Sequence, residues 1–570
     1  MSIAKAIQIV LLIGMVALFP MIVSAQSGPT EAPPRPPITA PEMPDGRGFI
    51  PPAINLDHLA PKKTPPSMAL SLPAAWDWRT QGMVTAVRNQ GACGSCYSFA
   101  STANFEAKIL VDGGSVFNFS ENNIKECNFW QTSCDGGNFH QVADWLSKAG
   151  TVLESCDPYV AADVACLGSC DYQKTLLDWR IISGESIPAT ADLKQYIYDN
   201  GPVYTTFYAG GVDDPGWTSE LNNYDGSYTL YSTDDYVTNH AVLIVGWDDT
   251  LTHAGGSGGW IVKNSWGTSW GGTCGYGTES GYFTIAYGSA NIGQWSSFIK
   301  EYQDYAGTGD LYYLDDGGWT TSYGYSNTTG YGLCEFILAS DQYITRVEFW
   351  TNDVTTDVDI WLYDDFNGST LSNLLASKLD TSFSEAGYHS VALPSPPQVA
   401  SGETVYAMVK FTNTIDNFPV ICDYTAPVAA GSSWLSYSGA SGSWTDMATI
   451  QVPCEVAIRI RTSPTLALGV GDIELPLPDD FELGYNYPNP FNPATTISYS
   501  LEEKAAVQVI VYNVLGQKVR TLVDSEQTVG EHEIVWDGRA DNDAEAGTGI
   551  YFYRIQVGEQ SQVKKMLLLR

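Results

Sequence analysis

The stretch Gln90–Ala100, which reads QGACGSCYSFA, places two cysteines at the start of a predicted helix. Small and apolar residues then recur on one helical stripe, namely Ala100, Ala103, Ala107 and Leu110. Gly113-Gly114 can end this helix. Cys96 is therefore predicted at the helix N-terminus, where unpaired N–H groups and the helix dipole favour a thiolate. Taken alone, the stretch also fits a disulfide-bonded cysteine pair in an exported protein.

Length and composition point to a large extracellular protein. The 570 residues are enough for several domains with real cores. The net charge of −36 argues against nucleic acid or an anionic membrane surface as a main partner. Frequent Gly, Tyr and Trp suit β-domains with many turns. The 11 cysteines form an odd number, so at least one thiol is free or paired with another molecule.

The N-terminal region has the features of an export signal followed by a linker. Residues 1–25 resemble a signal peptide, with Lys5 before an apolar run and Val23-Ser24-Ala25 as a cleavage site. An uncleaved membrane anchor is the alternative, and no later stretch is apolar for long enough to span a bilayer. Export would place the chain where disulfides persist. Residues 26–71 are rich in proline and are predicted to be an extended, poorly packed pro-segment or linker.

A cysteine nucleophile needs a base that takes its proton and returns it to the leaving group. Three histidines follow Cys96 in this part of the chain: His140, His240 and His253. His240 directly precedes the apolar run Ala241–Trp247, so a buried strand would fix its position. His240 is therefore the preferred candidate, although a lone histidine at a strand end is usually structural.

Three segments together carry a resemblance to a known family. Cys93–Tyr97 reads CGSCY, Leu72–Arg79 reads LPAAWDWR, and Lys263–Gly267 reads KNSWG. This region resembles the papain-family cysteine peptidases, and His240 follows Cys96 at a separation typical of that family. The resemblance implies an α+β peptidase over residues 72–300, with a helical first part and a β-rich second part.

The resemblance also implies a role for each catalytic position. Cys96 would be the nucleophile and His240 the base and acid, and Asn264 would orient the imidazole. Gln90 would form the oxyanion hole together with the backbone N–H of Cys96. Trp266 would shield the bond between His240 and Asn264 from water. We expect no metal and no cofactor.

The substrate cleft and the disulfides are implied in the same way. The residues expected to contact substrate are Gly136, Gly137, Phe139, Thr206 and Trp266. The two glycines would pair with an extended peptide, and Phe139 and Thr206 would favour an apolar P2 side chain. The implied disulfides are Cys93–Cys134 and Cys127–Cys166, with Cys156–Cys170 as an additional bridge. A zinc site is the alternative for the last pair, and Cys274, Cys334, Cys422 and Cys454 remain without assigned partners.

Two further domains are predicted after the peptidase. Residues 301–465 contain short alternating strands, such as Val358–Tyr363, and are predicted to form a β-sandwich. The sandwich resembles the lectin-like domains of some prokaryotic papain-family proteins, which implies a carbohydrate or protein ligand. Residues 466–484 would be a linker. Residues 485–570 resemble the Ig-like C-terminal sorting domains of the bacterial type IX secretion system, and a plain Ig-like spacer is the alternative.

The sequence therefore predicts a secreted or surface-located cysteine peptidase of a Gram-negative bacterium, exported through the periplasm. It would cleave protein or peptide substrates and engage the type IX machinery. Two other functions remain open at this point. One is an inactive papain-like binding protein or adhesin. The other is a transglutaminase-like acyltransferase, against which Asn264 argues because that class normally has an aspartate as its third residue.

Overall fold

The computed structural model describes residues 28–32, 47–59, 72–305, 309–465 and 481–570, the last range without 485, 487, 490, 502–503, 514–515 and 559. The predicted signal peptide lies outside the described residues, as do residues 466–480 of the predicted linker. No helix in the described ranges is long and apolar enough to cross a membrane.

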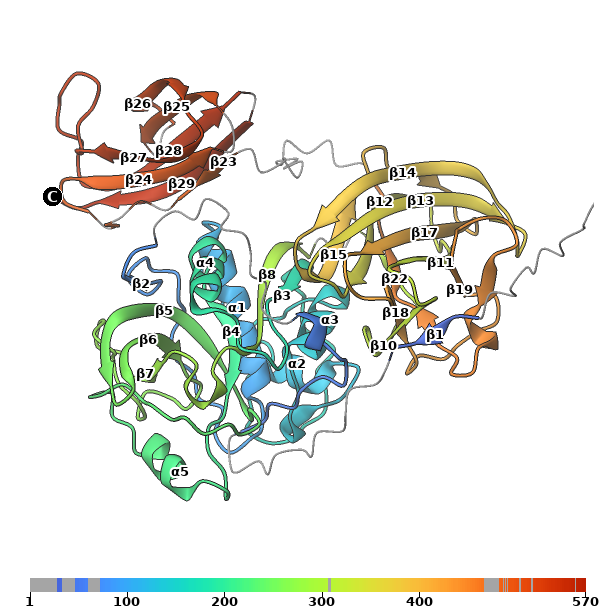
Figure 1. The fold of residues 1–570 in the computed structure, drawn as a ribbon, viewed down its shortest axis with the longest axis horizontal. Coiled ribbons are helices and arrows are strands. Elements are labelled where there is room, and N and C mark those ends of the chain that lie inside the picture. The colour runs from blue at the N-terminus through green and yellow to red at the C-terminus, as the bar shows by residue number, and fades with distance from the viewer. Residues whose placement is uncertain are drawn as a thin grey trace, which may run out of the picture.

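The first described part of the peptidase region is helical and the second is β-rich, as predicted (Figure 1). The helices are α1 (Cys96–Val111), α2 (Glu121–Cys127), α3 (Phe139–Lys148), α4 (Thr190–Asn200) and α5 (Pro215–Asn222). The strands are β2 (Ala75–Asp77), β3 (Lys174–Ile181), β4 (Val203–Phe207), β5 (His240–His253), β6 (Gly256–Lys263), β7 (Tyr282–Ala286) and β8 (Gln294–Asp304). The apolar runs at Ala241 and Gly259 thus lie in the paired strands β5 and β6.

The region after the peptidase is a β-sandwich, as the alternating strands predicted. Its strands are β9 (Leu311–Tyr312), β10 (Thr321–Gly324), β11 (Thr329–Ile337), β12 (Gln342–Thr351), β13 (Thr356–Phe366), β14 (Leu371–Phe383), β15 (Ala386–Ala392), β16 (Gln398–Val399), β17 (Thr404–Asn413), β18 (Val420–Asp423), β19 (Ser433–Ser436), β20 (Trp444–Asp446), β21 (Glu455–Val456) and β22 (Ile458–Ser463). One layer is a six-stranded sheet in the order β14-β13-β17-β11-β19-β20. Alternate residues of these strands, such as Val358, Ile360 and Leu362, fill the core between the layers.

The sandwich is continuous with the peptidase rather than tethered to it. Strand β15 pairs with β3 of the peptidase through Ala386–Tyr388 and Trp179–Ile181. This pairing joins the peptidase strands and β12, β22 and β9 into one 12-stranded sheet. Because a shared sheet fixes both strands through backbone hydrogen bonds, the two domains are held in one orientation.

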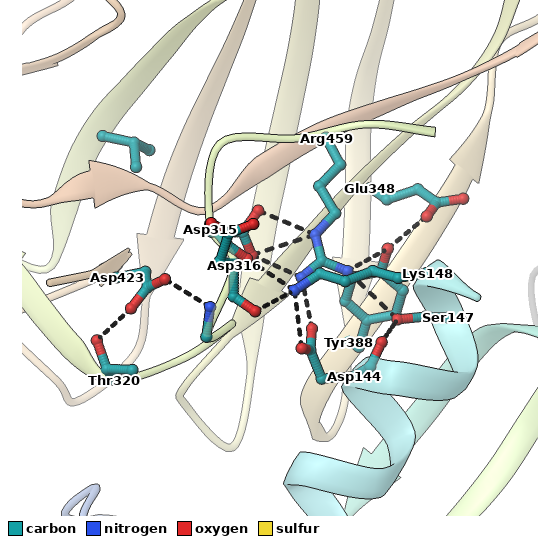
Figure 2. Close-up of polar contacts among 12 residues, drawn as sticks. Asp144, Ser147, Lys148, Asp315, Asp316, Thr320, Glu348, Tyr388, Asp423 and Arg459 are labelled. Carbon is teal, nitrogen blue, oxygen red and sulfur yellow. Dashed lines mark hydrogen bonds and ion pairs between the residues drawn. The ribbon is translucent and has the colours of Figure 1, made fainter. Parts of the chain in front are cut away.

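A buried ion cluster reinforces this joint (Figure 2). Arg459 on β22 is fully buried and bonds Asp144 of α3 at 2.5 Å and Asp315 at 2.6 Å. Its guanidinium also stacks over Trp350 at 4.3 Å. Lys148, one turn after Asp144 on α3, donates to the Asp144 carboxylate and to the backbone oxygens of Asp315 and Asp316. The sandwich therefore holds the C-terminal half of a peptidase helix by charge pairs that are almost completely buried.

The C-terminal strands form a separate two-sheet domain (Figure 1). Its strands are β23 (Phe481–Leu483), β24 (Thr495–Leu501), β25 (Ala505–Asn513), β26 (Lys518–Gln527), β27 (Gly530–Trp536), β28 (Gly549–Val557) and β29 (Gln560–Leu568). They form the sheets β23-β24-β27 and β26-β25-β28-β29. Trp536, Tyr553 and Met566 are fully buried between these sheets. This is the small Ig-like sandwich that the alternating pattern predicted.

The segment before the peptidase corrects one prediction. Residues 47–59 were expected to be poorly packed, but Phe49, Ile54, Leu56 and Leu59 are all buried against the peptidase core. Apolar side chains interspersed among the prolines supply this packing. Farther upstream, β1 (Thr30–Glu31) pairs with β10 of the sandwich.

Candidate active site

The predicted nucleophile lies at the first residue of α1, at the bottom of the interface between the helical and β-rich parts. Cys96 is fully buried and has no disulfide partner. The backbone N–H of Ala241, at the start of β5, donates to its Sγ at 3.3 Å. Ala241, the residue after His240, therefore contacts the Cys96 sulfur directly. The structure thus brings the start of β5, which carries His240, next to the start of α1, which carries Cys96.

The predicted orienting residue contacts the predicted base. Nε2 of His240 bonds Oδ1 of Asn264 at 2.9 Å, and Asn264 follows the end of β6 beside β5. Nδ1 of His240 has no hydrogen-bond partner among the described residues. If Nε2 carries the proton toward Asn264, Nδ1 is the ring nitrogen that can accept a proton from a thiol.

An aromatic side chain covers the bond between His240 and Asn264. The ring of Trp266 lies 4.9 Å from that of His240, and Trp270 packs edge-on against Trp266 at 4.9 Å. The indole therefore packs against the imidazole ring, and its role in keeping water from the bond stays a prediction.

Gln90 is held from both sides. Its Nε2 donates to the backbone oxygen of Cys93 at 2.9 Å, and its Oε1 accepts from Ser265 Oγ at 2.5 Å. Its backbone N–H also donates to Ser265 O at 2.8 Å. The segment that carries Asn264 thus fixes the side chain predicted for the oxyanion hole.

Burial determines the charge of the two central groups in this structure. It raises the pKa of the Cys96 thiol to about 12, against a partial lowering by backbone N–H groups that include those of Ala241 and Gly48. Burial also lowers the pKa of His240 to about 3, which the bond to Asn264 opposes only in part. In the covered site, therefore, both groups are neutral at pH 7.

The cover is the segment before the peptidase, which lies across the cleft. Gly137 donates its N–H to Gly48 O at 2.9 Å and accepts from Ile50 N at 3.0 Å, and Phe49 forms a parallel bridge with Gly137. Phe49 N donates to Asn239 O at 3.0 Å, directly before His240. The segment thus adds to the cleft wall as a short strand, the binding mode predicted for substrate at Gly137.

Two residues of this segment fit the cleft closely. Gly48 passes so near the CGSC loop that a Cβ there would lie 1.7 Å from the backbone oxygen of Gly94, so only glycine is accommodated. Phe49 is 1% exposed, and its ring lies 6.3 Å from Trp295 within the apolar cluster that includes Phe139 and Tyr204. Phe49 thus belongs to the same apolar cluster as Phe139, and the role of Phe139 in receiving a substrate side chain stays a prediction.

Three disulfides brace the helical part of the cleft. They are Cys93–Cys134 and Cys127–Cys166, the pairs that the resemblance implied, and Cys156–Cys170, the additional bridge predicted with a zinc site as its alternative. The first ties the CGSC loop to the turn that precedes Gly136 and Gly137. Cys274, Cys334, Cys422 and Cys454 are free thiols here.

Two other residues predicted to contact substrate, Thr206 and Gly136, have structural roles in this fold. Thr206 on β4 is fully buried, and its hydroxyl donates to Gln294 O at 3.1 Å and lies 3.0 Å from Thr238 Oγ1, from which it accepts. Gly136 has a positive φ of 102° and shapes the turn before Gly137. The roles of both toward substrate stay predictions.

Sequence reasoning missed three participants in the site. Phe49 was hidden in the proline-rich segment, although an aromatic residue after two glycines in such a stretch is a usable signal. Trp295 approaches the cleft from β8, far along the chain, and no local pattern indicates it. Ser265 was read only as part of the KNSWG segment, whereas its hydroxyl holds Gln90.

Comparison with known families divides the chain as the fold does. Residues 72–299 match the family model described as papain family cysteine protease, residues 311–462 match the lectin like domain, and residues 492–561 match the FlgD Ig-like domain. These matches agree with the peptidase, sandwich and Ig-like regions of the structure.

Curated relatives match the peptidase part. The viral cathepsin of Adoxophyes honmai nucleopolyhedrovirus is 30% identical over 232 residues, which are 40% of this chain and 61% of the relative. The cathepsin L-like proteinase of Fasciola hepatica is 31% identical over 227 residues, 39% of this chain and 63% of the relative. The chain thus spans about three fifths of the length of these relatives.

A solved structure matches both of the first two domains. It comprises the cysteine protease and lectin-like domains of Cwp84, a surface layer associated protein of Clostridium difficile. The TM-score is 0.59 at 19% identity, over 74% of this chain and 93% of that one, which establishes a shared fold. By these matches, residues 72–299 correspond to the papain family cysteine protease domain, residues 311–462 to the lectin like domain and residues 492–561 to the FlgD Ig-like domain.

Proposed function

We propose that this protein is a secreted cysteine endopeptidase that hydrolyses peptide bonds through Cys96. The observation that carries the proposal is the contact set at the cleft floor, where Ala241 N–H meets Cys96 Sγ and His240 bonds Asn264. Protein substrates follow from the family match and from a cleft wall that pairs with extended backbone.

The reaction begins when the thiol proton passes to Nδ1 of His240, which forms a thiolate and an imidazolium. The thiolate attacks the carbonyl carbon of the scissile bond, and the resulting oxyanion is stabilised by the Gln90 amide and the Cys96 N–H. The imidazolium then gives its proton to the leaving amine, and the C–N bond breaks. Asn264 keeps the ring in the orientation that both transfers need.

Water hydrolyses the acyl-enzyme in the second half of the reaction. Neutral His240 takes a proton from a water molecule, which attacks the thioester carbon. The tetrahedral intermediate collapses with release of the carboxylic acid product, and the sulfur leaves as thiolate. The imidazolium and the thiolate then stand ready for the next substrate.

The structure described above is the latent form of this enzyme. Residues 48–50 pair with the cleft wall at Gly137, and the N–H of Gly48 is among the backbone groups at the Cys96 sulfur. In this covered form Cys96 and His240 are both neutral. We take this segment, which forms a parallel bridge with Gly137, as a cover over the cleft wall. Activity requires this segment to leave the cleft.

The flanking domains suit a role outside the cell. We assign a carbohydrate or protein ligand to the lectin-like domain, on the strength of its family match. The Ig-like domain would be a sorting tag read by the type IX machinery, which would place the enzyme on the surface of a Gram-negative bacterium or in its medium. The signal peptide would first bring the chain to the periplasm.

A fluorogenic peptide assay with and without a thiol alkylator tests the enzymatic proposal. Cys96→Ala is expected to lower turnover by about 10⁴-fold or more, because a nucleophile and its base act as a unit. Cys274→Ala is the matched control, since Cys274 is a free cysteine outside the cleft. Near-normal turnover of Cys96→Ala would refute the mechanism. So would inhibition by the alkylator that disappears in Cys274→Ala.

A further inference from the structure

The side chain of Tyr159, which is not among the predicted site residues, contacts both ends of the loop Gln90–Ser95, here called the catalytic loop. The hydroxyl of Tyr159 donates to the backbone oxygen of Gln90 at 2.8 Å and lies 2.7 Å from Ser95 Oγ. Gln90 is the oxyanion-hole residue of the proposed function, and Ser95 directly precedes Cys96. Tyr159 therefore joins the two parts of the loop that must keep a fixed separation during catalysis.

Tyr159 is itself held from several sides. Its ring packs edge-on against Phe99, one turn into α1, with centroids 4.7 Å apart. Its backbone N–H donates to Oε1 of Glu154 at 2.8 Å. Burial raises the pKa of its phenol to about 12, so the hydroxyl keeps its proton at neutral pH. Because that proton goes to Gln90 O, the phenol oxygen accepts the proton of Ser95.

The pairing with Tyr159 changes what Ser95 does. Ser95 is the N-cap residue of α1, a position where serine usually accepts a hydrogen bond from the first turn of the helix. Here its side chain makes no capping bond. The first N–H groups of the helix, those of Cys96 and Tyr97, are directed instead at the Cys96 sulfur, where they lower the thiol pKa.

We propose that Tyr159 is a positioning residue of this peptidase, which withdraws Ser95 from capping α1 and fixes the Gln90 carbonyl. The first action leaves the helix N-terminus open to the Cys96 thiolate. The second keeps the Gln90 side chain in place as the oxyanion forms. The inference rests on the proposed function and adds to it a residue that touches neither substrate nor sulfur.

The test uses Tyr159→Phe, Ser95→Ala and the double variant in the activated full-length chain, with Tyr302→Phe as a control for loss of a tyrosine hydroxyl. Two readouts are needed. Peptide turnover gives kcat and KM, and the pH profile of Cys96 alkylation by iodoacetamide, followed by mass spectrometry, gives the thiol pKa. Alkylation does not depend on peptide cleavage, so it reads the thiol even if the proposed function fails.

Tyr159→Phe is expected to lower kcat roughly 3- to 10-fold, the effect of one lost hydrogen bond, with KM changed less than about twofold. Its alkylation profile should move to higher pH, because Ser95 is then free to cap the helix. In the double variant that profile should return toward wild type, while kcat stays low because the Gln90 anchor is still missing.

Three results would overturn the inference. An unchanged kcat and pH profile in Tyr159→Phe would show that the hydroxyl is dispensable. A double variant whose profile stays shifted would exclude capping by Ser95 as the cause. If Tyr159→Phe does not fold, the alkylation profile of Ser95→Ala tests the inference. Because the Ser95 side chain does not cap the helix in the wild type, its removal should leave the profile unchanged. A shifted profile would contradict the inference.

Discussion

Two fully buried polar groups of residues, the catalytic pair and the Arg459 cluster, respond to burial in opposite ways. Among the residues that the structure describes, no opposite charge stabilises the charged form of Cys96 or His240. Burial moves the pKa of each toward the neutral form, and the like charge of Arg47 adds to this effect at His240. Arg459 is equally buried, but Asp315 and Asp144 pair with it, and the pKa of the guanidinium is raised. Burial without a counterion thus makes a site whose charge changes when its cover leaves, whereas burial with counterions makes a permanent joint.

The largest expected effect on stability comes from breaking the joint. Arg459→Met should cost about 3–5 kcal/mol in the free energy of unfolding, because it leaves the buried Asp315 carboxylate without its partner and Asp144 with Lys148 alone. Urea denaturation followed by tryptophan fluorescence measures the loss. Lys410→Met is the matched control, since its pair with Asp359 in the same sandwich is partly exposed and should be worth less than about 1 kcal/mol.

Adding Asp315→Asn to Arg459→Met should restore part of this stability, since it removes the orphaned charge of Asp315. Equal losses for Arg459→Met and Lys410→Met would mean that burial does not distinguish these two ion pairs. The comparison between the joint and the catalytic pair would then fail.

An intermediate effect is expected from acid on the covered cleft. The pKa of His240 is about 3 under the cover and should be near its ordinary value of 6.5 once the cleft opens. The stability of the covered state is therefore complete above pH 6.5 and falls as the pH drops toward 3. At pH 5 the cover should be weaker than at pH 7 by about 2 kcal/mol, or roughly 30-fold in the open fraction.

Hydrogen exchange of residues 47–59 measures the open fraction, after correction for the intrinsic pH dependence of exchange. The Cys96→Ala chain is the suitable background, because it cannot remove its own cover. His240→Gln in that background is the control and should abolish the extra opening in acid. An acid-insensitive segment in the Cys96→Ala chain would show that His240 does not become protonated on opening.

The smallest effect on the fold is expected from removal of residues 485–570. The deletion removes β24–β29 and leaves β23. Strands β23–β29 pair only with one another among the described residues, so the unfolding free energy of the first two domains should change by less than about 0.5 kcal/mol. Location should change instead: in the native host, the truncated enzyme is expected to remain in the periplasm as a competent peptidase. Unchanged delivery to the surface or medium would reduce the Ig-like domain to a spacer.

The local patterns of the sequence predicted many of the helices and strands that carry the site. The stripe after Cys96 predicted α1, the apolar runs predicted β5 and β6, and the alternation around Val358 predicted a sandwich strand. The positions of Gln90, His240 and Asn264 were named from short motifs. These features are local or carry a fixed spacing, so periodicity and motif order are sufficient to locate them.

Only the tertiary structure decided what covers each of these elements. The alternation along β22 predicts that Arg459 faces the opposite side of the strand from Ile458 and Ile460. It does not predict that a peptidase helix lies against the side of Arg459 and buries its charge. Likewise, the proline-rich composition around Phe49 gives no hint that this segment pairs with Gly137 and neutralises the catalytic groups. Sequence patterns record which face of an element is apolar, whereas the charge of a buried group depends on neighbours that are far away along the chain.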